Sequence, residues 1–205
     1  MSEYTLYYIN GCPGARAVRL YMTYKNIEVN EILLDLSKGE HRTPEYLELN
    51  PMHTVPTLKV TTDNSSSGLF ESRIILKYLD NNSDLNIDKW LYWDLGFLNP
   101  NVGKIIYPRI FRNEEPNMKD LPALIEKFEY LNTTLDDRDF LVGDTLSIAD
   151  LSCSMLIENS QFCSDLVNVN NYPNIVSWIN NIKNEIGEDK WNTIMNPFYL
   201  WRDKK

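Results

Sequence analysis

A cysteine placed directly before a helical pattern is the first feature of the chain that could do chemistry. Cys12 precedes a proline and a glycine, and helical spacing of apolar residues follows over residues 15–25. The free N–H groups and the positive dipole end of a helix start favour a thiolate there. The other cysteines, Cys153 and Cys163, show no metal-type spacing, and three cysteines argue against a disulfide framework. We expect free thiols in a reducing compartment and no metal site.

The two histidines of the chain lie near a single Val-Pro dipeptide, Val55-Pro56. His41 and His53 are the only two histidines in 205 residues, and both fall in the loops around Pro56. Taken singly, each is typical of a solvated polar residue. Together they offer N–H donors beside a single turn.

Two helix starts carry residues that pair with backbone donors. Glu71-Ser72 stands where a short strand enters a helix, so it forms either a plain N-terminal cap or an anion site built from N–H groups and a hydroxyl. The Val-Pro turn upstream favours the anion site. Ser147 and Asp150 have the spacing of a capping box, which predicts a folding role at the start of a buried helix.

Residues 4–80 must position these groups, and they alternate between strand and helix patterns. Strands are expected at 4–9, 31–36, 57–61 and 68–70, and helices at 15–25 and 71–79, in the order β-α-β then β-β-α. The segment between residues 43 and 56 is expected to be loop, and residues 61–68 a solvated hairpin tip.

From Leu91 onward the strand pattern ends and amphipathic segments follow, which predicts a helical domain. Prolines are expected to break these segments, at positions 100, 108, 116, 122, 173 and 197. We divide the chain into a first domain over residues 1–80, a linker over 81–88 and a helical domain over 89–205.

The composition of the chain argues against nucleic-acid and membrane partners. The chain holds 29 Asp or Glu against 20 Lys or Arg, a net charge of −9, which disfavours a nucleic-acid partner. The N-terminus has no apolar stretch typical of a signal peptide, and no apolar run approaches the length of a membrane span. We therefore expect a cytoplasmic protein without a membrane partner.

The order of elements, with a proline directly before the third strand, resembles the thioredoxin-like arrangement, in which the Val55-Pro56 peptide would be cis. Several motifs resemble cytosolic glutathione transferases, most closely the arthropod delta and epsilon classes. They are Gly39-Glu40-His41, Pro44-Glu45-Tyr46, the run from Asn50 to Leu58, Glu71-Ser72-Arg73, Leu91-Tyr92-Trp93-Asp94, Tyr107 to Phe111 and Phe140 to Asp150. The resemblance implies an α/β thioredoxin-like N-terminal domain followed by an all-α C-terminal domain, and a homodimer.

The resemblance also implies how glutathione binds. It implies that His41 and His53 contact the glycine end and that Glu71 pairs with the γ-glutamyl amine. Val55, before Pro56, would supply backbone hydrogen bonds to the cysteinyl unit. Lys and Arg are scarce in this region, so the histidine N–H groups and Arg73 are the available donors for the two glutathione carboxylates, and Ser72 is expected to bind glutathione beside Glu71. Glutathione is then a co-substrate, and no further cofactor is expected.

The group that faces the glutathione sulfur stays open between two residues. In the resembled classes a serine stands four positions before the arginine of the first helix, and counting back from Arg16 gives Cys12. A thiol is a weaker donor than a hydroxyl, so Cys12 favours a mixed disulfide with glutathione or is a small buried residue. Tyr8, at the end of the first strand, matches the tyrosine of the tyrosine-type classes; Tyr7 should point to the opposite face.

The acceptor is expected to be a small hydrophobic electrophile bound between the domains. Tyr107 and Phe111, at i and i+4 of one helix, are the candidate contacts, although such pairs are also typical of cores. The aromatic tail over residues 196–202 either caps this pocket or docks on the surface. Two functions follow: a detoxifying glutathione transferase with thiol-transfer or peroxidase side activity, or a non-catalytic protein of this fold that carries a lipophile or serves as an interaction module.

Overall fold

The computed structural model describes residues 2–203. Its described residues divide into two compact units: the first comprises residues 2–82 and 189–203, and the second spans Ser83–Glu188. The segment from Asp189, which the sequence places with the helical domain, therefore groups with the first unit.

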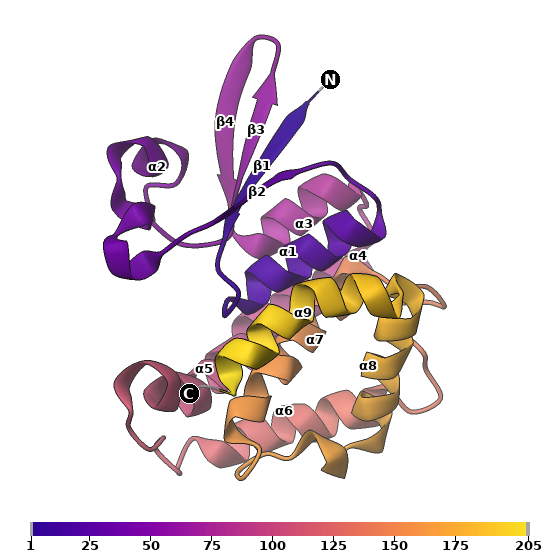
Figure 1. The fold of residues 1–205 in the computed structure, drawn as a ribbon. Coiled ribbons are helices and arrows are strands. Elements are labelled where there is room, and N and C mark those ends of the chain that lie inside the picture. Colours follow the sequence, from indigo (N-terminus) through magenta and orange to yellow (C-terminus); the bar gives the residue numbers. More distant parts are fainter. Residues whose placement is uncertain (1, 204–205) are drawn as a thin grey trace. The chain divides into compact units, whose positions relative to one another are not determined.

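A four-stranded mixed sheet forms the centre of the first unit (Figure 1). The strand order is β2-β1-β3-β4, with β1 parallel to β2 and the other neighbours antiparallel. The elements of this unit are β1 (Glu3–Tyr8), α1 (Pro13–Tyr24), β2 (Asn30–Leu33), η1 (Leu36–Lys38), η2 (Glu40–Arg42), α2 (Pro44–Leu49), β3 (Thr57–Thr62), β4 (Ser65–Phe70), α3 (Ser72–Asp80) and α9 (Glu188–Arg202). This confirms the predicted thioredoxin-like arrangement.

Helices cover the two faces of the sheet unequally. On β1, Tyr8 lies beneath the Arg19 guanidinium of α1, whereas Tyr7 packs edge-on against Tyr46 of α2, with ring centroids 5.5 Å apart. The alternation of strand side chains thus separates α1 from α2, and α3 packs beside α1 (Figure 1). The core between β1, β3 and these helices includes Leu6 and Leu58, both without exposed surface.

Two segments predicted as loop are ordered elements instead. Thr43 and Pro44 start the short helix α2, because the Thr43 hydroxyl accepts the Tyr46 N–H at 3.3 Å and Pro44 has the backbone angle of a first helical residue. The serines of the expected hairpin tip pair with β3, Ser65 opposite Thr62, and only Asp63 and Asn64 form the turn. Serine is poor in strands, but backbone pairing of an exposed edge needs no buried side chain.

The second unit is helical, as predicted. Its elements are α4 (Leu85–Trp93), η3 (Asp94–Leu98), α5 (Asn99–Tyr107), η4 (Pro108–Arg112), α6 (Leu121–Thr134), α7 (Ile148–Ser160), η5 (Gln161–Cys163), η6 (Val169–Asn171) and α8 (Pro173–Ile186). The expected breaks at Pro100 and Pro108 are wrong: η3 and η4 are π-helical turns beside these prolines, and helical backbone continues from Leu85 to Arg112. The wider π turn accommodates a residue that lacks an N–H. In the first unit, α9 likewise continues through Pro197.

The central helix of the second unit is α7, in which every residue is buried. Its start confirms the predicted capping box: the Asp150 carboxylate accepts the Ser147 N–H at 2.9 Å, and also bonds to Leu141 and Trp178. None of the helices among residues 2–203 is both long and apolar enough to cross a membrane.

Candidate active site

The Val55-Pro56 peptide is cis, and buried polar groups fix the loop that carries it. Asn50, which has no exposed surface, donates to the Thr54 carbonyl at 3.0 Å and to the Thr57 hydroxyl at 2.9 Å. The Tyr46 hydroxyl bonds to the same two partners. Satisfied buried networks of this kind hold one conformation, so the backbone of Val55 is presented in a defined geometry.

Cys12 lies against this loop. It is the residue before the first turn of α1, with φ of −81° and ψ of 117°, and its Sγ donates to the Val55 carbonyl at 3.3 Å. The thiol is half-buried. Burial raises its pKa, against the lowering effects of the Ala15 and Gly14 backbone and of the Arg16 charge. This direction is opposite to the thiolate expected from the helix start, because desolvation outweighs the dipole.

The first residue of α3 lies close to the start of α1 and to the cis-proline. A Cβ added at Gly14 would lie 2.6 Å from the Ser72 Oγ and 3.6 Å from Pro56, so the first turn of α1, the cis-proline and Ser72 are in close contact. Glu71, just before α3, has a φ of +67° and an exposed side chain. A non-glycine residue in that region costs of order 1–3 kcal/mol, and such residues cluster at functional sites. Cys12, Val55, Pro56 and Ser72 therefore form one cluster, with Glu71 at its edge.

The two histidines lie near each other, with ring centroids 6.2 Å apart. His53 is exposed and has a φ of +46°. His41 accepts a hydrogen bond from Arg42 at Nε2, while its Nδ1 is buried and meets no partner among the described residues. Burial, followed by the charges of Arg42 and His53, lowers the pKa of His41, which favours the neutral ring at pH 7.

Tyr8 has different surroundings from Cys12. Its side chain is only 9% exposed, and the Arg19 guanidinium lies 4.1 Å above its ring. Arg19 in turn forms a two-point ion pair with Glu31, at 2.7 and 2.8 Å. These contacts are typical of a packed strand residue, and they hold the ring between α1 and β2.

Tyr107 and Phe111, the candidate acceptor contacts, pack edge to face with ring centroids 5.5 Å apart in the second unit. Their side chains are 40% and 68% exposed, so they are not core. Tyr107 lines a pocket of about 650 Å³, and Phe111 does not. The other lining residues are Asn99, Pro100, Gly103, Lys104, Pro108, Arg112, Glu114, Glu115, Asn117 and Asp120.

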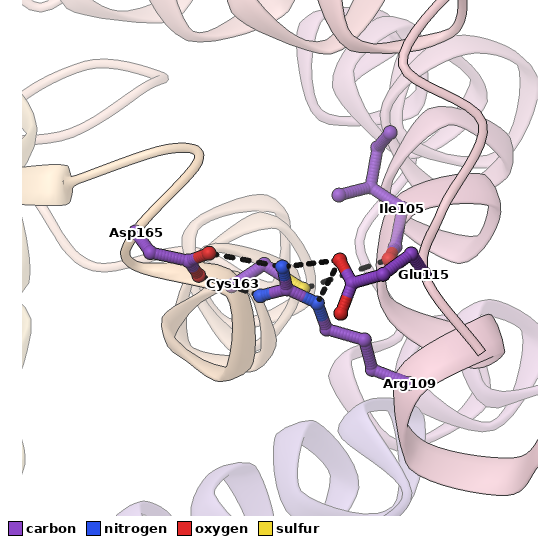
Figure 2. A network of polar contacts seen from close by, with 5 residues as sticks. All are labelled: Ile105, Arg109, Glu115, Cys163 and Asp165. Carbon is purple, nitrogen blue, oxygen red and sulfur yellow. Dashed lines mark hydrogen bonds and ion pairs between the residues drawn. The ribbon is translucent and has the colours of Figure 1, made fainter. Parts of the chain in front are cut away.

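An ion-pair network holds the helical turn between these two aromatic residues. Figure 2 shows Arg109 between Asp165 and Glu115, with its guanidinium 2.9 Å from Asp165 Oδ2 and 2.7 Å from Glu115. The neighbouring Cys163 thiol points to the Ile105 carbonyl at 3.5 Å. Arg109 lowers the pKa of Asp165, so the pair stays charged well below neutral pH. The network fixes η4, which carries Phe111, against the segment after η5.

The sequence motifs contain Tyr46 and Asn50, but they did not predict the supporting role of these residues or of Gly14. Tyr46 and Asn50 are the buried polar supports of the cluster, and Gly14 allows α3 to approach. A buried Asn in a loop rich in Thr and Pro leaves no periodic signal, so its burial could not be predicted from residue spacing. No group of three potential metal ligands occurs within residues 2–203.

The chain thus has a thioredoxin-like unit with a thiol directly before its first helix, followed by a helical unit. Comparison with known proteins identifies the family. The family described as "Glutathione S-transferase, N-terminal domain" matches residues 2–81, and "Glutathione S-transferase, C-terminal domain" matches residues 108–191. The chain belongs to the glutathione S-transferase family.

Solved structures agree. A delta-class glutathione transferase of Nilaparvata lugens is 27% identical over 96% of this chain and 99% of its own, with a TM-score of 0.79. A glutathione transferase of Bombyx mori in complex with GTT is 27% identical over 98% and 97%, with a TM-score of 0.84. A transferase of Phanerochaete chrysosporium in complex with oxidized glutathione has the same fold at 22% identity, 96% and 98% coverage and a TM-score of 0.82.

Proposed function

We propose that this glutathione S-transferase binds glutathione at the cluster of Cys12, Val55, Pro56 and Ser72 and conjugates it to small hydrophobic electrophiles. The observation that carries the proposal is the 3.3 Å contact from the Cys12 thiol to the Val55 carbonyl beside the cis-proline. The Val55 backbone then pairs with the cysteinyl unit of glutathione, which directs the glutathione sulfur toward the first turn of α1. The likeness to the delta-class enzyme of Nilaparvata lugens supports a place near that class.

The ends of glutathione require charged partners. At the γ-glutamyl end, the exposed Glu71 carboxylate pairs with the ammonium group, and Ser72 donates to the carboxylate. At the glycine end, His41 and His53 supply N–H donors, with Arg73 as a further cation. The buried Nδ1 of His41, unpaired among the described residues, supports this assignment, because a ligand carboxylate would complete its hydrogen bond.

Cys12, rather than Tyr8, faces the glutathione sulfur in this proposal. Tyr8 is engaged by Arg19, whereas Cys12 lies at the cis-proline loop. A thiol donates weakly, so it lowers the pKa of bound glutathione less than a serine hydroxyl does. The same thiol permits disulfide exchange: the Cys12 thiolate attacks oxidised glutathione, one glutathione thiolate leaves, and the protein keeps the other as a mixed disulfide. The raised pKa of Cys12 makes this a slow side activity at pH 7.

The acceptor binds at Tyr107 and Phe111. The two rings are exposed and in contact, so they offer apolar surface to a small apolar molecule. The pocket beside Tyr107 is lined mainly by polar and charged residues, so the support comes from the rings and not from the pocket. The weak Cys12 donor favours a second function, a non-catalytic glutathione-binding protein that carries a lipophile at the same rings. The two functions differ in one result, since only the enzyme consumes the electrophile.

Binding is tested by retention on immobilised glutathione. The double change Glu71→Ala with Ser72→Ala should abolish retention while the helical circular-dichroism signal is kept. Glu48→Ala, which removes an exposed carboxylate from α2 in the same unit, serves as the matched control and should still be retained. Retention of the double variant at the wild-type level would contradict the assignment.

The role of Cys12 is tested by conjugation of an aromatic halide. Cys12→Ser restores a hydroxyl, which should lower the pKa of bound glutathione by about one to two units and raise the conjugation rate accordingly. The variant should also lose the mixed disulfide that wild type forms with oxidised glutathione. If Tyr8→Phe, and not Cys12→Ser, changes the pKa of bound glutathione, the sulfur faces Tyr8 instead.

We also propose a homodimer in the cytoplasm. Cys12, Cys153 and Cys163 form no disulfide within residues 2–203, which suits a reducing compartment. Exposed apolar side chains on α4 and η3 offer surface for a symmetric contact, among them Tyr92 at 72%, Leu95 at 45% and Phe97 at 54% exposed.

A further inference from the structure

The aromatic tail lies against the segment that leads into Cys12. Helix α9 runs beside α1 (Figure 1), and its Phe198 has no exposed surface. The guanidinium carbon of Arg16, on α1, lies 3.6 Å from the centroid of the Phe198 ring. Arg16 is itself fully buried, so this cation-π contact is shielded from water and is stronger than an exposed one.

Two backbone positions directly before Cys12 are held through these aromatic residues. The Arg16 Nη1 donates to the Asn10 carbonyl at 2.8 Å. At Gly11 the Trp201 ring approaches so closely that an added Cβ would lie 3.0 Å from it. The Phe198 and Trp201 rings are themselves neighbours, with centroids 6.4 Å apart. The tail therefore contacts the connection between β1 and α1 directly at Gly11, through Trp201, and indirectly at Asn10, because Phe198 packs on the Arg16 side chain that bonds there.

We propose that Trp201, together with Phe198 and Arg16, is a positioning residue for Cys12: it seats the Asn10-Gly11 backbone and thereby keeps the Cys12 Sγ directed at the Val55 carbonyl. The backbone of Cys12 bonds to its near neighbours, its N–H to the Ile9 carbonyl at 3.3 Å and its carbonyl to the Arg16 N–H at 3.1 Å, so its position follows that of the connection and of the first turn of α1. This deepens the proposed site, because it rests on Cys12 being the thiol there.

Loss of the Trp201 ring should change the chemistry of the thiol in a defined direction. Burial is the main cause of the raised Cys12 pKa, and the charged groups facing the thiol are Arg16 from α1 and Arg73 from α3, both of which lower it. Tyr46 of α2 also interacts with the thiol. If the connection loosens, water reaches Cys12 while both cations remain, so its pKa falls. A fall of about one unit raises the thiolate fraction at pH 7 about tenfold.

The test is the rate of Cys12 alkylation by iodoacetamide as a function of pH, followed by mass spectrometry of the Cys12 peptide. In wild type the midpoint should lie above 9.0, the ordinary thiol value. Trp201→Ala should raise the rate at pH 7 about tenfold and lower the midpoint by about one unit. Trp201→Phe, which keeps an aromatic ring, should restore most of the wild-type profile. Leu200→Ala removes a neighbouring side chain that is 64% exposed and should leave the profile unchanged.

Cys153 and Cys163 provide an internal reference for folding, because they are 0% and 1% exposed. If Trp201→Ala makes these two cysteines react as well, that variant has unfolded. The proposal is then tested with Gly11→Ala, because the added Cβ displaces the Trp201 ring from the other side of the contact. A selective rise at Cys12 in that variant supports the proposal. A Cys12 profile within twofold of wild type in the folded variant overturns it. The assay uses no glutathione, so its failure is distinct from a failure of the proposed function.

Discussion

At the scale of single residues, the histidine pair reports ligand binding most simply. Burial and the charges of Arg42 and His53 lower the pKa of His41, so its ring should titrate below 6.5 in the free protein. A glutathione carboxylate beside the ring favours the protonated form, so saturating glutathione should raise that midpoint. Proton NMR resolves this readily, since the chain has two histidines and His53→Gln identifies the other signal. An unchanged His41 midpoint would place the carboxylates elsewhere.

The same shift has a consequence for stability. A histidine whose folded pKa is lowered binds fewer protons than the unfolded chain does near pH 6. The free energy of unfolding should therefore fall as the pH drops below 6.5 and through the folded midpoint. The half-buried ring makes this contribution small.

The resemblance of the motifs around Val55-Pro56 predicted the cis peptide, and strand alternation predicted that Tyr7 and Tyr8 face opposite ways; the structure has both features. The contacts of the named residues with glutathione stay a prediction. The protonation of Cys12 was not predictable in this manner. A helix start favours a thiolate, whereas the observed burial disfavours it more strongly, and burial depends on segments distant in sequence. The engagement of Tyr8 by Arg19 likewise depends on how α1 lies over the sheet.

At the scale of elements, the contact between α2 and β4 depends on one glycine. A Cβ at Gly68 would lie 2.0 Å from the Leu49 carbonyl oxygen, so Gly68→Ala must separate the edge strand from the end of α2. Forced overpacking costs about 1–3 kcal/mol, which lowers the melting temperature by several degrees. Differential scanning calorimetry measures this change in melting temperature.

Gly96→Ala is the matched control for that change. An added Cβ at Gly96 meets no atom within 4 Å, and the residue lies within the long helical segment. Alanine there should stabilise the protein by up to about 1 kcal/mol. Equal melting temperatures for the two variants would show that the α2–β4 contact is dispensable.

Sequence patterns were sufficient for elements with a clear period and insufficient elsewhere. The strand and helix order of the first unit follows from apolar alternation and helical spacing, which the structure confirms. Helix α2 has six residues, too few to show a period, and the serine strand has no apolar alternation. Pro100 and Pro108 were expected to end helices, because proline lacks the N–H that an α-helix needs. The π-helical turns that let the helix continue there cannot be recognised from the sequence.

At the scale of the whole molecule, we expect two copies in solution. Exposed apolar side chains on α4 and η3 should be covered in a symmetric dimer. Sedimentation at micromolar concentration should then give close to twice the chain mass of 24.0 kDa. Tyr92→Glu, a charge on the most exposed of these aromatic residues, should shift the protein toward monomer. A wild-type protein that sediments as a single chain would contradict the expectation.

The central claim is that glutathione binds with its sulfur at Cys12, and a crystal structure of the protein soaked with glutathione tests it most directly. The measured quantity is the distance from the glutathione sulfur to the Cys12 Sγ. We expect a separation within about 4 Å, with the cysteinyl backbone of glutathione on Val55. A sulfur beside the Tyr8 hydroxyl, or a ligand bound away from the Val55-Pro56 loop, would contradict it.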